Sequence, residues 1–562
     1  MSLQPQAVYI VPEETARVAH AIFPKPNPIM RMYDEFGVIF NDADFADLFP
    51  PQGQSALAPV RLALASILQF MEGLTDRQAA DAVRTRIDWK YLLCLELTNP
   101  GFDHTVLSEF RTRLLDHNAQ RRLFDTLLAL AQDRGLLKAG GRQRSDSTHV
   151  LGATRTLNRL ECVTETMRHT LNVLSTVAPQ WLRGHTTSEW VERYGVRASE
   201  YRFPKSDAGR LLWAEQVGSD GMALLLALYS LYCADAAHSA PTPPASPSLW
   251  DLEAVQILRR VWIQNFVVIE GELQWRDNDN TPPAGKYIGS PYDIDVRYAN
   301  KGSTTWTGYK VHLTETCDEE GPNLITNVET TTAAVADDAV TGAIHASLVE
   351  HKLAPDKHIA DTGFVNSKLL AHSEQQYGIN LIGPTRSDNR WQAKEGNGFA
   401  AQDFAIDWEQ QQAICPQGQV SSSWTPGIDH RKNEVITIKF GRAKCGVCES
   451  AAKCTRTQPP RRAITIRPQA QYEALLSARQ REGSEEYKHE YARRAGMEGT
   501  IAQGVRSCGL RRSHYMGLAK NHLRHLMTAA GMNLMRMIRW LMGEKKATTP
   551  VSAFALLYQR AA

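Results

Sequence analysis

The stretch EYKHEYARRAGMEGTIAQGVRSCGLRRSHYMGLAK, residues 486–520, carries an unusual set of polar side chains at helical spacing. Read as a helix, it places Tyr491, Arg494 and Glu498 at positions i, i+3 and i+7, along one face. An amphipathic helix normally buries Leu or Val there, whereas this stripe presents a phenol, a guanidinium and a carboxylate. Such a stripe is typical either of a metal ligand held beside a polyanion or of a solvated helix with a local ion pair.

Basic residues follow the stripe. Residues 491–546 contain eleven Lys and Arg against two Glu and no Asp. The basic residues nearest the stripe are Arg506, Arg511, Arg512 and Lys520. Because the whole chain has a net charge of only +2, any affinity for nucleic acid must come from a local patch of this kind. The patch predicts a phosphate-facing surface.

The composition is that of a soluble globular protein, with 43% hydrophobic and 22% charged residues in a chain of 562. The N-terminus lacks the basic-then-apolar pattern of a signal peptide, and the longest apolar run, residues 222–234, is too short to span a bilayer. Nine Cys without a secretion signal favour a reducing compartment. We therefore expect a cytoplasmic protein without a membrane partner.

Hydrophobic periodicity divides the first half of the chain. Residues 1–45 are interrupted by Pro and predict an irregular arm. Residues 46–135 have helical spacing, with Thr75 as an N-cap after Gly73, and predict an all-helical domain for DNA binding or, equally, for dimerisation. Residues 140–155 predict a strand. Residues 156–290 predict a helical insertion that contains a Pro/Ser linker at 239–248.

The second half predicts a mixed α/β sheet with helices packed on it. After the insertion, residues 291–400 follow the order hairpin, helix, strand, helix, strand. Residues 401–468 are a Cys-rich β insertion, residues 469–545 predict C-terminal helices, and residues 546–562 form a tail. The fold class is thus α/β, with an all-helical N-terminal domain and two insertions.

Three acids occupy positions that suit a common site. Asp146 lies in the first predicted strand, Asp361 ends a later strand, and Glu498 lies on the stripe. Converging carboxylates repel one another unless a cation neutralises them, and Mg²⁺ or Mn²⁺ prefers such oxygen ligands. Two such ions can activate a water or a 3′-hydroxyl for attack on a phosphodiester. Spacing alone leaves a structural role open, because any sheet has acids at strand ends.

Five motifs in order resemble bacterial insertion-sequence transposases of the DDE type, which have an RNase H-like core. RSDSTHV is similar to their first-Asp strand, WTGYKVHLT to the following hairpin, HIADTGFVN to the second-Asp strand, and Tyr-x2-Arg-x3-Glu to the signature around the third acid. The helical segment ending in FDHTVLSEFRTRL is similar to the InsH-type N-terminal domain. The resemblance covers most of residues 45–540.

The resemblance implies that Asp146, Asp361 and Glu498 bind catalytic Mg²⁺ or Mn²⁺. It implies that Tyr491 and Arg494 position the strand near the cut. Many relatives have a basic residue seven positions after the Glu; here that position is Val505, and Arg506 follows it. The other residues we expect to contact DNA are Lys310, Arg511, Arg512 and Lys520.

The Cys-rich insertion has metal-ligand spacing. Cys445 and Cys448 form C-x2-C, Cys454 follows, and Cys415 precedes Pro416 upstream. Four thiolates from two knuckles predict a closed structural zinc site, with four unligated thiols as the alternative.

Together these features predict a transposase that binds terminal inverted repeats, cleaves the ends and joins their 3′-hydroxyls to target DNA. Its partner is double-stranded DNA, and pairing two ends implies at least a homodimer on DNA. We expect it in the cytoplasm, at the nucleoid when it acts. Two alternatives remain: a catalytically silent DNA-binding protein, and an RNase H-like nuclease without strand transfer.

Overall fold

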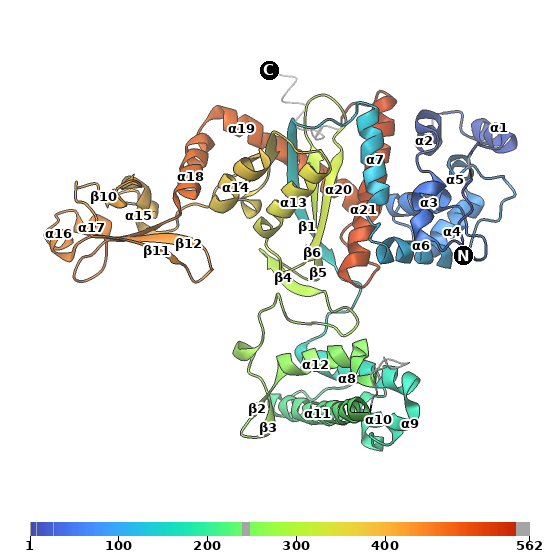
Figure 1. Ribbon diagram of the computed structural model, residues 1–562, viewed down its shortest axis with the longest axis horizontal. Helices are drawn as coiled ribbons and strands as arrows, with labels where there is room; N and C mark the ends of the chain where they lie inside the picture. Colours follow the sequence, from blue (N-terminus) through green and yellow to red (C-terminus); the bar gives the residue numbers. More distant parts are fainter. Residues whose placement is uncertain (1, 7, 26, 239–247, 547–562) are drawn as a thin grey trace.

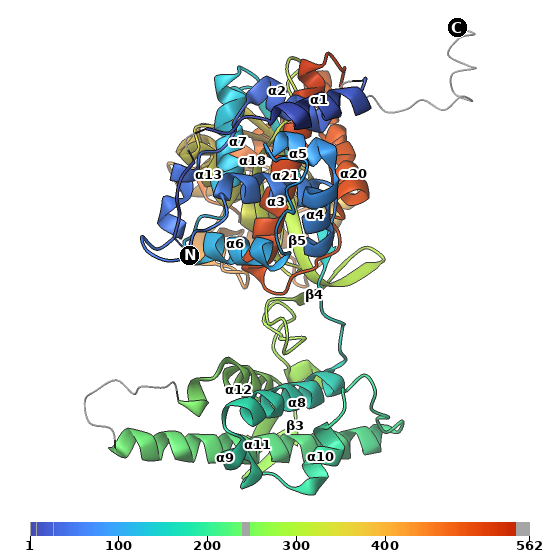
Figure 2. The ribbon, with the colours of Figure 1, turned by 90° about the vertical axis from the view of Figure 1, so that its right-hand side faces the viewer.

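The computed structural model describes residues 2–6, 8–25, 27–238 and 248–546. Residues 239–247 of the predicted linker and 547–562 of the predicted tail lie outside the described residues. Figure 1 shows a central sheet flanked by helices, a helical unit below it and a small β-rich unit to one side. Figure 2, turned by 90°, shows the same separation of the lower helical unit from the rest.

Helices occupy most of the chain before the first strand. They are α1 (Glu13–Ile22), α2 (Pro28–Phe36), η1 (Asp42–Leu48), α3 (Pro59–Met71), α4 (Asp76–Thr85), α5 (Ile87–Leu92), α6 (Thr105–Asp116) and α7 (Arg122–Asp133). The predicted cap is confirmed, since the Thr75 side chain accepts from the Gln78 N–H and completes a capping box at the start of α4.

The prediction of an irregular arm for residues 1–45 is wrong, because α1 and α2 lie there and two of its prolines stand at helix starts. Pro28 stands in the first turn of α2, where its missing N–H is not needed, and Pro12 is the N-cap of α1. Ile29 and Phe36 of α2 are buried in the same apolar core as α3. Burial of this face stabilises a helix of only nine residues.

A six-stranded mixed sheet forms the centre, in the order β4-β5-β1-β7-β8, with β6 also paired to β5. Its strands are β1 (Arg142–Leu151), β4 (Arg297–Lys301), β5 (Thr304–Thr316), β6 (Ile325–Thr332), β7 (Lys357–Ile359) and β8 (Asn380–Ile382). β1 runs antiparallel to β5 and parallel to β7. The predicted order of strand, hairpin, helix, strand, helix and strand is confirmed, and β4 was not anticipated.

Helices pack on this sheet and hold it against the N-terminal helices. α13 (Asp338–Glu350) and α14 (Ser367–Tyr377) connect β6, β7 and β8. The C-terminal elements are α18 (Gln469–Glu482), α19 (Glu485–Ala492), η6 (Arg493–Ala495), α20 (Gly496–Cys508) and α21 (Leu518–Leu541). α21 packs on β6, α3 and α7, so it joins sheet and N-terminal helices into one continuous core.

The predicted helical insertion has a separate apolar core. Its elements are α8 (Arg159–Val177), α9 (Pro179–Arg183), α10 (Ser188–Tyr194), α11 (Asp207–His238), η2 (Leu249–Asp251), α12 (Glu253–Asn265), β2 (Phe266–Ile269), β3 (Glu272–Trp275) and η3 (Asn278–Asn280). Within α11, residues 207–234 are long and apolar enough to cross a membrane, which residues 222–234 alone are not. One such helix is weak evidence, because core helices meet the same criterion, and α11 packs against α8, α12 and β3.

The β-rich unit has a small core of its own around Phe404, Ile438 and Phe440. α15 (Trp391–Lys394) and η5 (Ala401–Asp403) precede it. It contains β9 (Ala405–Asp407), β10 (Gln412–Ile414), β11 (Ser423–Ile428), β12 (Glu434–Lys439), β13 (Ala463–Ile466), α16 (Arg442–Gly446) and α17 (Ala451–Cys454). It lies at the far left of Figure 1, away from the central sheet.

Candidate active site

Two of the predicted acids lie at matching positions on neighbouring parallel strands, Asp146 within β1 and Asp361 just after β7. Arg144 of β1 pairs with Ile359 of β7, and Asp146 and Asp361 each lie two residues beyond this pair. The Asp361 carboxylate caps a 3-10 turn, η4 (Thr362–Phe364), by accepting from the Gly363 N–H at 2.8 Å. The parallel register of β1 and β7 therefore brings the two carboxylates to one edge of the sheet.

The third acid reaches this edge through Arg494. The Arg494 guanidinium donates through Nη1 to Asp146 Oδ2 at 2.8 Å, and its Nη2 lies 3.7 Å from Glu498 Oε1. The side chain of Asp146 is 13% exposed, whereas that of Glu498 is 71% exposed. One guanidinium thus bridges the strand acid and the helix acid, and Glu498 stays open to solvent.

Hydrogen bonds from Arg144 of β1 hold the site residues in place. Arg144 Nη1 donates to the carbonyl of Arg493 at 2.5 Å, and its Nε and Nη2 donate to Glu315 Oε1 at 2.8 and 2.6 Å. Because Arg144 is two residues from Asp146 and Arg493 precedes Arg494, this contact joins the strand to the turn that carries the bridging guanidinium.

Burial raises the pKa of the Asp146 carboxyl, and the nearby charge of Asp361 raises it further. The Ser147 N–H, Arg494 and Lys301 oppose this rise by favouring the charged form. Burial also raises the pKa of the Tyr491 phenol, whose ring stacks on Tyr487 with centroids 5.8 Å apart. The site is therefore a carboxylate pair that needs positive charge, with one arginine supplying part of it.

Two charged residues at the site escaped the sequence analysis. Lys301, at the end of β4, is close enough to influence the pKa of Asp146, and no local pattern around it indicates this. Asp337 is the N-cap residue of α13, and a Cβ on Gly363 would meet both Asp361 Oδ1 at 2.9 Å and Asp337 Oδ2 at 3.1 Å. The Asp cap of α13 was visible in the sequence, but not its position beside Asp361.

The predicted DNA-contacting residues lie in three regions: beside β1, on the surface of α20 and α21, and on β5. Arg511 donates through Nε to Thr148 Oγ1 on β1 at 2.9 Å, and Arg512 pairs with Leu151 at the end of that strand. Both are exposed, as are Arg506 at the end of α20 and Lys520 on α21. Lys310 instead donates to the Val335 carbonyl at 2.8 Å and Asp337 Oδ1 at 3.2 Å, so it is engaged within the protein.

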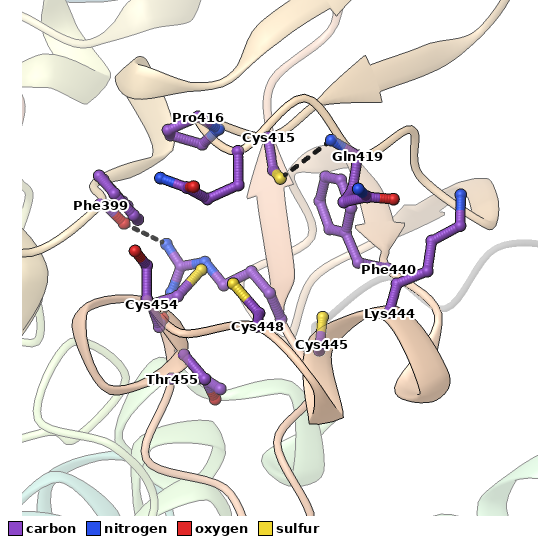
Figure 3. A pocket seen from close by; sticks show the side chains of 14 residues that line it. Phe399, Cys415, Pro416, Gln419, Phe440, Lys444, Cys445, Cys448, Cys454 and Thr455 are labelled. Atoms are coloured by element: carbon purple, nitrogen blue, oxygen red, sulfur yellow. Dashed lines mark hydrogen bonds between the residues drawn. The ribbon is translucent and has the colours of Figure 1, made fainter.

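The four predicted zinc ligands surround one small, enclosed pocket of the β-rich unit. Cys415, Cys445, Cys448 and Cys454 line it together with Phe399, Phe440 and Arg462. Figure 3 shows Cys415 on one side and the other three thiols opposite. Burial raises the pKa of the Cys454 thiol to about 11. Within the described ranges, no group of three or more His, Cys, Asp or Glu side chains is spaced to hold a metal ion.

Comparison with known proteins defines the class of protein. Residues 414–538 match a family described as transposase DDE domain, and residues 18–113 match the transposase domain DUF772. No curated protein and no solved structure matches the chain. These two matches support an insertion-sequence transposase of the DDE class.

Only one of the two matches includes residues of the candidate active site. The DDE match includes Tyr491, Arg494 and Glu498, and the second match covers most of the N-terminal helices. Asp146 and Asp361 lie outside both matched ranges. Their assignment rests on the geometry around Arg494.

Proposed function

We propose that this protein binds the terminal inverted repeats of its own element, cleaves the ends and joins their 3′-hydroxyls to target DNA. The observation that carries the proposal is the position of Arg494, which contacts both Asp146 and Glu498 while Asp361 lies beside Asp146. Three carboxylates from β1, the end of β7 and α20 thereby share one exposed edge of the mixed sheet. We take this sheet to be an RNase H-like catalytic core.

The three carboxylates are the oxygen donors that Mg²⁺ or Mn²⁺ prefers, but they would have to move closer together around an ion, because no three acids among the described residues are spaced to hold one. The negative charge of Asp361 repels that of Asp146 and raises the pKa of Asp146. A hard cation bound by both carboxylates would remove that repulsion. A divalent ion held by Asp146, Asp361 and Glu498 supplies the activation of a water or 3′-hydroxyl and the stabilisation of the leaving oxygen. Arg494 donates to Asp146 Oδ2, the atom that a cation would also use, so a bound cation would compete with this contact and would leave the guanidinium available to a DNA phosphate.

The surrounding side chains hold the strand that is cut. Tyr491 and Arg494 position the scissile phosphate. The single helix expected for residues 491–498 is broken, with Tyr491 at the end of α19, Arg494 in η6 and Glu498 in α20, and Arg494 lies next to both other side chains. Lys301 and Arg511 add positive charge around Asp146. Arg506, Arg512 and Lys520 contact backbone phosphates further along the DNA, and Lys310 orients Asp337 at the floor of the site.

Each segment of the chain takes a distinct task. Residues 46–135 recognise the ends with the preceding residues 1–45 packed on them, and residues 140–155, 291–400 and 469–545 build the catalytic core. Residues 156–290 and 401–468 are insertions, and residues 546–562 are a tail. Two copies pair two ends, so the active form on DNA is at least a homodimer. The protein acts in the cytoplasm, on DNA of the nucleoid.

The Cys-rich insertion holds a structural zinc ion. The supporting observation is that all four Cys line one small pocket, from which a zinc ion would displace the thiol protons. Binding has to draw the thiols closer together, since they are not spaced for a metal in the metal-free chain. The test is the zinc content of the purified protein: one equivalent for wild type and loss in Cys448→Ser would support the site, and no zinc in either would contradict it.

Two other functions fit the same fold. A catalytically silent DNA-binding protein would keep the sheet and the basic patch, but it would have no need to keep three acids around Arg494. An RNase H-like nuclease would cleave without joining. Short inverted repeats flanking the gene, if present, would favour the transposase over both of these alternatives.

The proposal predicts that Asp361→Asn and Glu498→Gln each abolish Mg²⁺-dependent cleavage of the flanking DNA and leave binding of that DNA largely intact. The amide keeps the shape of the side chain but removes the charge that holds the cation. Cleavage is measured on a labelled duplex and binding by gel shift.

Glu486→Gln is the matched control, because Glu486 is exposed on the same run of helices and has no partner among the described residues. It should cleave as wild type does. Wild-type cleavage by Glu498→Gln would show that the acids are wrongly assigned.

A further inference from the structure

A hollow of about 580 Å³ lies where the N-terminal helices meet the end of α20. One wall is the turn between α3 and α4 with the first turn of α4, and the other is residues 506–509 with His514, Tyr515 and Arg524. Arg506 is eight residues beyond Glu498, which is about 12 Å along a helix axis. The hollow is therefore separate from the three acids but on the same helix as one of them.

The most unusual residue of the hollow is Arg524 of α21. The residue is 2% exposed, its Nη2 donates to the Gly509 carbonyl at 2.6 Å, and its buried Nη1 has no hydrogen-bond partner in the part of the chain that the structure describes. Burial lowers the pKa of Arg524 to about 10, so the group is still charged at neutral pH. A buried cation without a counter-ion is costly, and an anion would offset that cost.

The acids in the wall do not supply this anion, because other arginines hold them. Asp76 accepts from Arg111 Nη2 at 2.6 Å, and Glu72 is paired with Arg86. Arg77 and Arg506 are exposed and have no ion pair among the described residues. The first turn of α4 also presents the positive end of a helix to the hollow. The uncompensated charge of the hollow is thus positive.

We propose that this hollow binds a phosphate group of the DNA backbone, with Arg524 at its base and Arg77 and Arg506 at its rim. The inference rests on the proposed function and deepens it: the N-terminal helices and the catalytic helix would grip one phosphate together. A duplex bound there would be fixed relative to Glu498 along α20. Free inorganic phosphate offers the same chemistry, so the test must separate the two sources.

The test is the salt dependence of duplex binding by the full chain, measured by fluorescence anisotropy on labelled flanking DNA. Each lost phosphate contact should reduce the slope of log K against log salt by about 0.9. We expect Arg77→Gln and Arg506→Gln each to lower the slope by one such step. Arg210→Gln, an exposed arginine on α11 of the insertion, should keep the wild-type slope. Slopes equal to that of Arg210→Gln in both variants would overturn the proposal.

Two further outcomes distinguish a DNA phosphate from a free phosphate ion and test the proposed function itself. Inorganic phosphate should raise the Tm of wild type above that in chloride of equal ionic strength, and Arg524→Gln should lose this rise. A phosphate-dependent Tm with unchanged DNA slopes would overturn the DNA assignment in favour of a free phosphate ion. Absence of salt-dependent duplex binding by wild type would instead overturn the proposed function itself.

Discussion

Asp146 is the residue on which the electrostatics of the site depend. Its carboxyl is buried beside Asp361, which raises its pKa, and three positive or donor groups lower it again. A carboxyl with a raised pKa takes up its proton at a higher pH than an ordinary Asp as the pH falls, and the protonated form is a poor cation ligand. Cation binding and proton release are therefore linked at this residue.

We expect the Mg²⁺ concentration needed for half-maximal cleavage to rise as the pH falls toward the raised pKa of Asp146, beginning above the ordinary Asp value of 3.8. Lys301→Gln removes a charge that favours the ionised form, so it should move this rise to higher pH. Lys286→Gln, an exposed lysine before β4, is the control. Cleavage measured across a pH series tests this, and identical profiles for Lys301→Gln and wild type would exclude the linkage.

For single residues, the sequence identifies site residues that belong to a motif. It does not identify those that only folding brings to the site. Asp146, Asp361, Arg494 and Glu498 could be named because each lies in a recognisable stretch. Lys301 could not, since it comes to Asp146 only through pairing of β4, β5 and β1. Lys310 was expected to face DNA, but hairpin alternation alone does not reveal that Asp337 and Val335 lie within its reach.

Glu315 joins the elements that carry the site. Its carboxylate has no exposed surface and accepts from Arg144 of β1 at 2.6 Å, Thr500 of α20 at 2.6 Å and Arg536 of α21 at 2.8 Å. A buried charge with this many partners is satisfied, but removing it leaves the buried Arg144 and the partly buried Arg536 without their carboxylate partner. The network therefore fixes α20 on the sheet.

Glu315→Gln should lower the free energy of unfolding of the core by about 3–5 kcal/mol, because it breaks a buried ionic network by removing one partner. Urea unfolding followed by tryptophan fluorescence measures this. Glu319→Gln removes a carboxylate that is 79% exposed and pairs with Arg493, and it should leave the midpoint unchanged. Equal midpoints for the two variants would contradict the role given to Glu315.

The insertion depends on a close approach of α11 and α12. A Cβ on Gly221 would lie 2.0 Å from the ring of Trp262, which is 2% exposed. Gly221→Ala should therefore push the helices apart and cost about 1–3 kcal/mol. Gly342→Ala in α13, where nothing lies within 4 Å of the added methyl, should be neutral or slightly stabilising. Thermal unfolding of both variants tests the packing, and an unchanged Tm for Gly221→Ala would refute it.

Elements with strong periodicity were predictable, whereas segments rich in Pro were not. The strand order around the sheet and the C-terminal helices follow from alternation and helical spacing. α1 and α2 were missed because their prolines stand at helix starts, and such positions look like interruptions until the buried face is known. β4 was missed because its pairing partner lies across a turn with little apolar pattern.

At the scale of the whole molecule, the N-terminal helices and the C-terminal helices of the DDE match share one continuous core, whereas residues 414–466 of that match lie in the β-rich unit. α21 packs on both the sheet and α3, so the N-terminal helices are fixed relative to the site. The helical insertion and the β-rich unit project from this core with separate apolar cores (Figures 1 and 2).

The most direct measurement is excision in cells, with the native flanks of the gene bracketing a reporter and the protein supplied separately. The account predicts excision by wild type and by Glu486→Gln, and none by Glu498→Gln. Loss of activity with retained binding of the flanks would locate the defect in the chemistry rather than in the fold. Excision by Glu498→Gln at the wild-type rate would contradict the central claim that the acids around Arg494 form the active site.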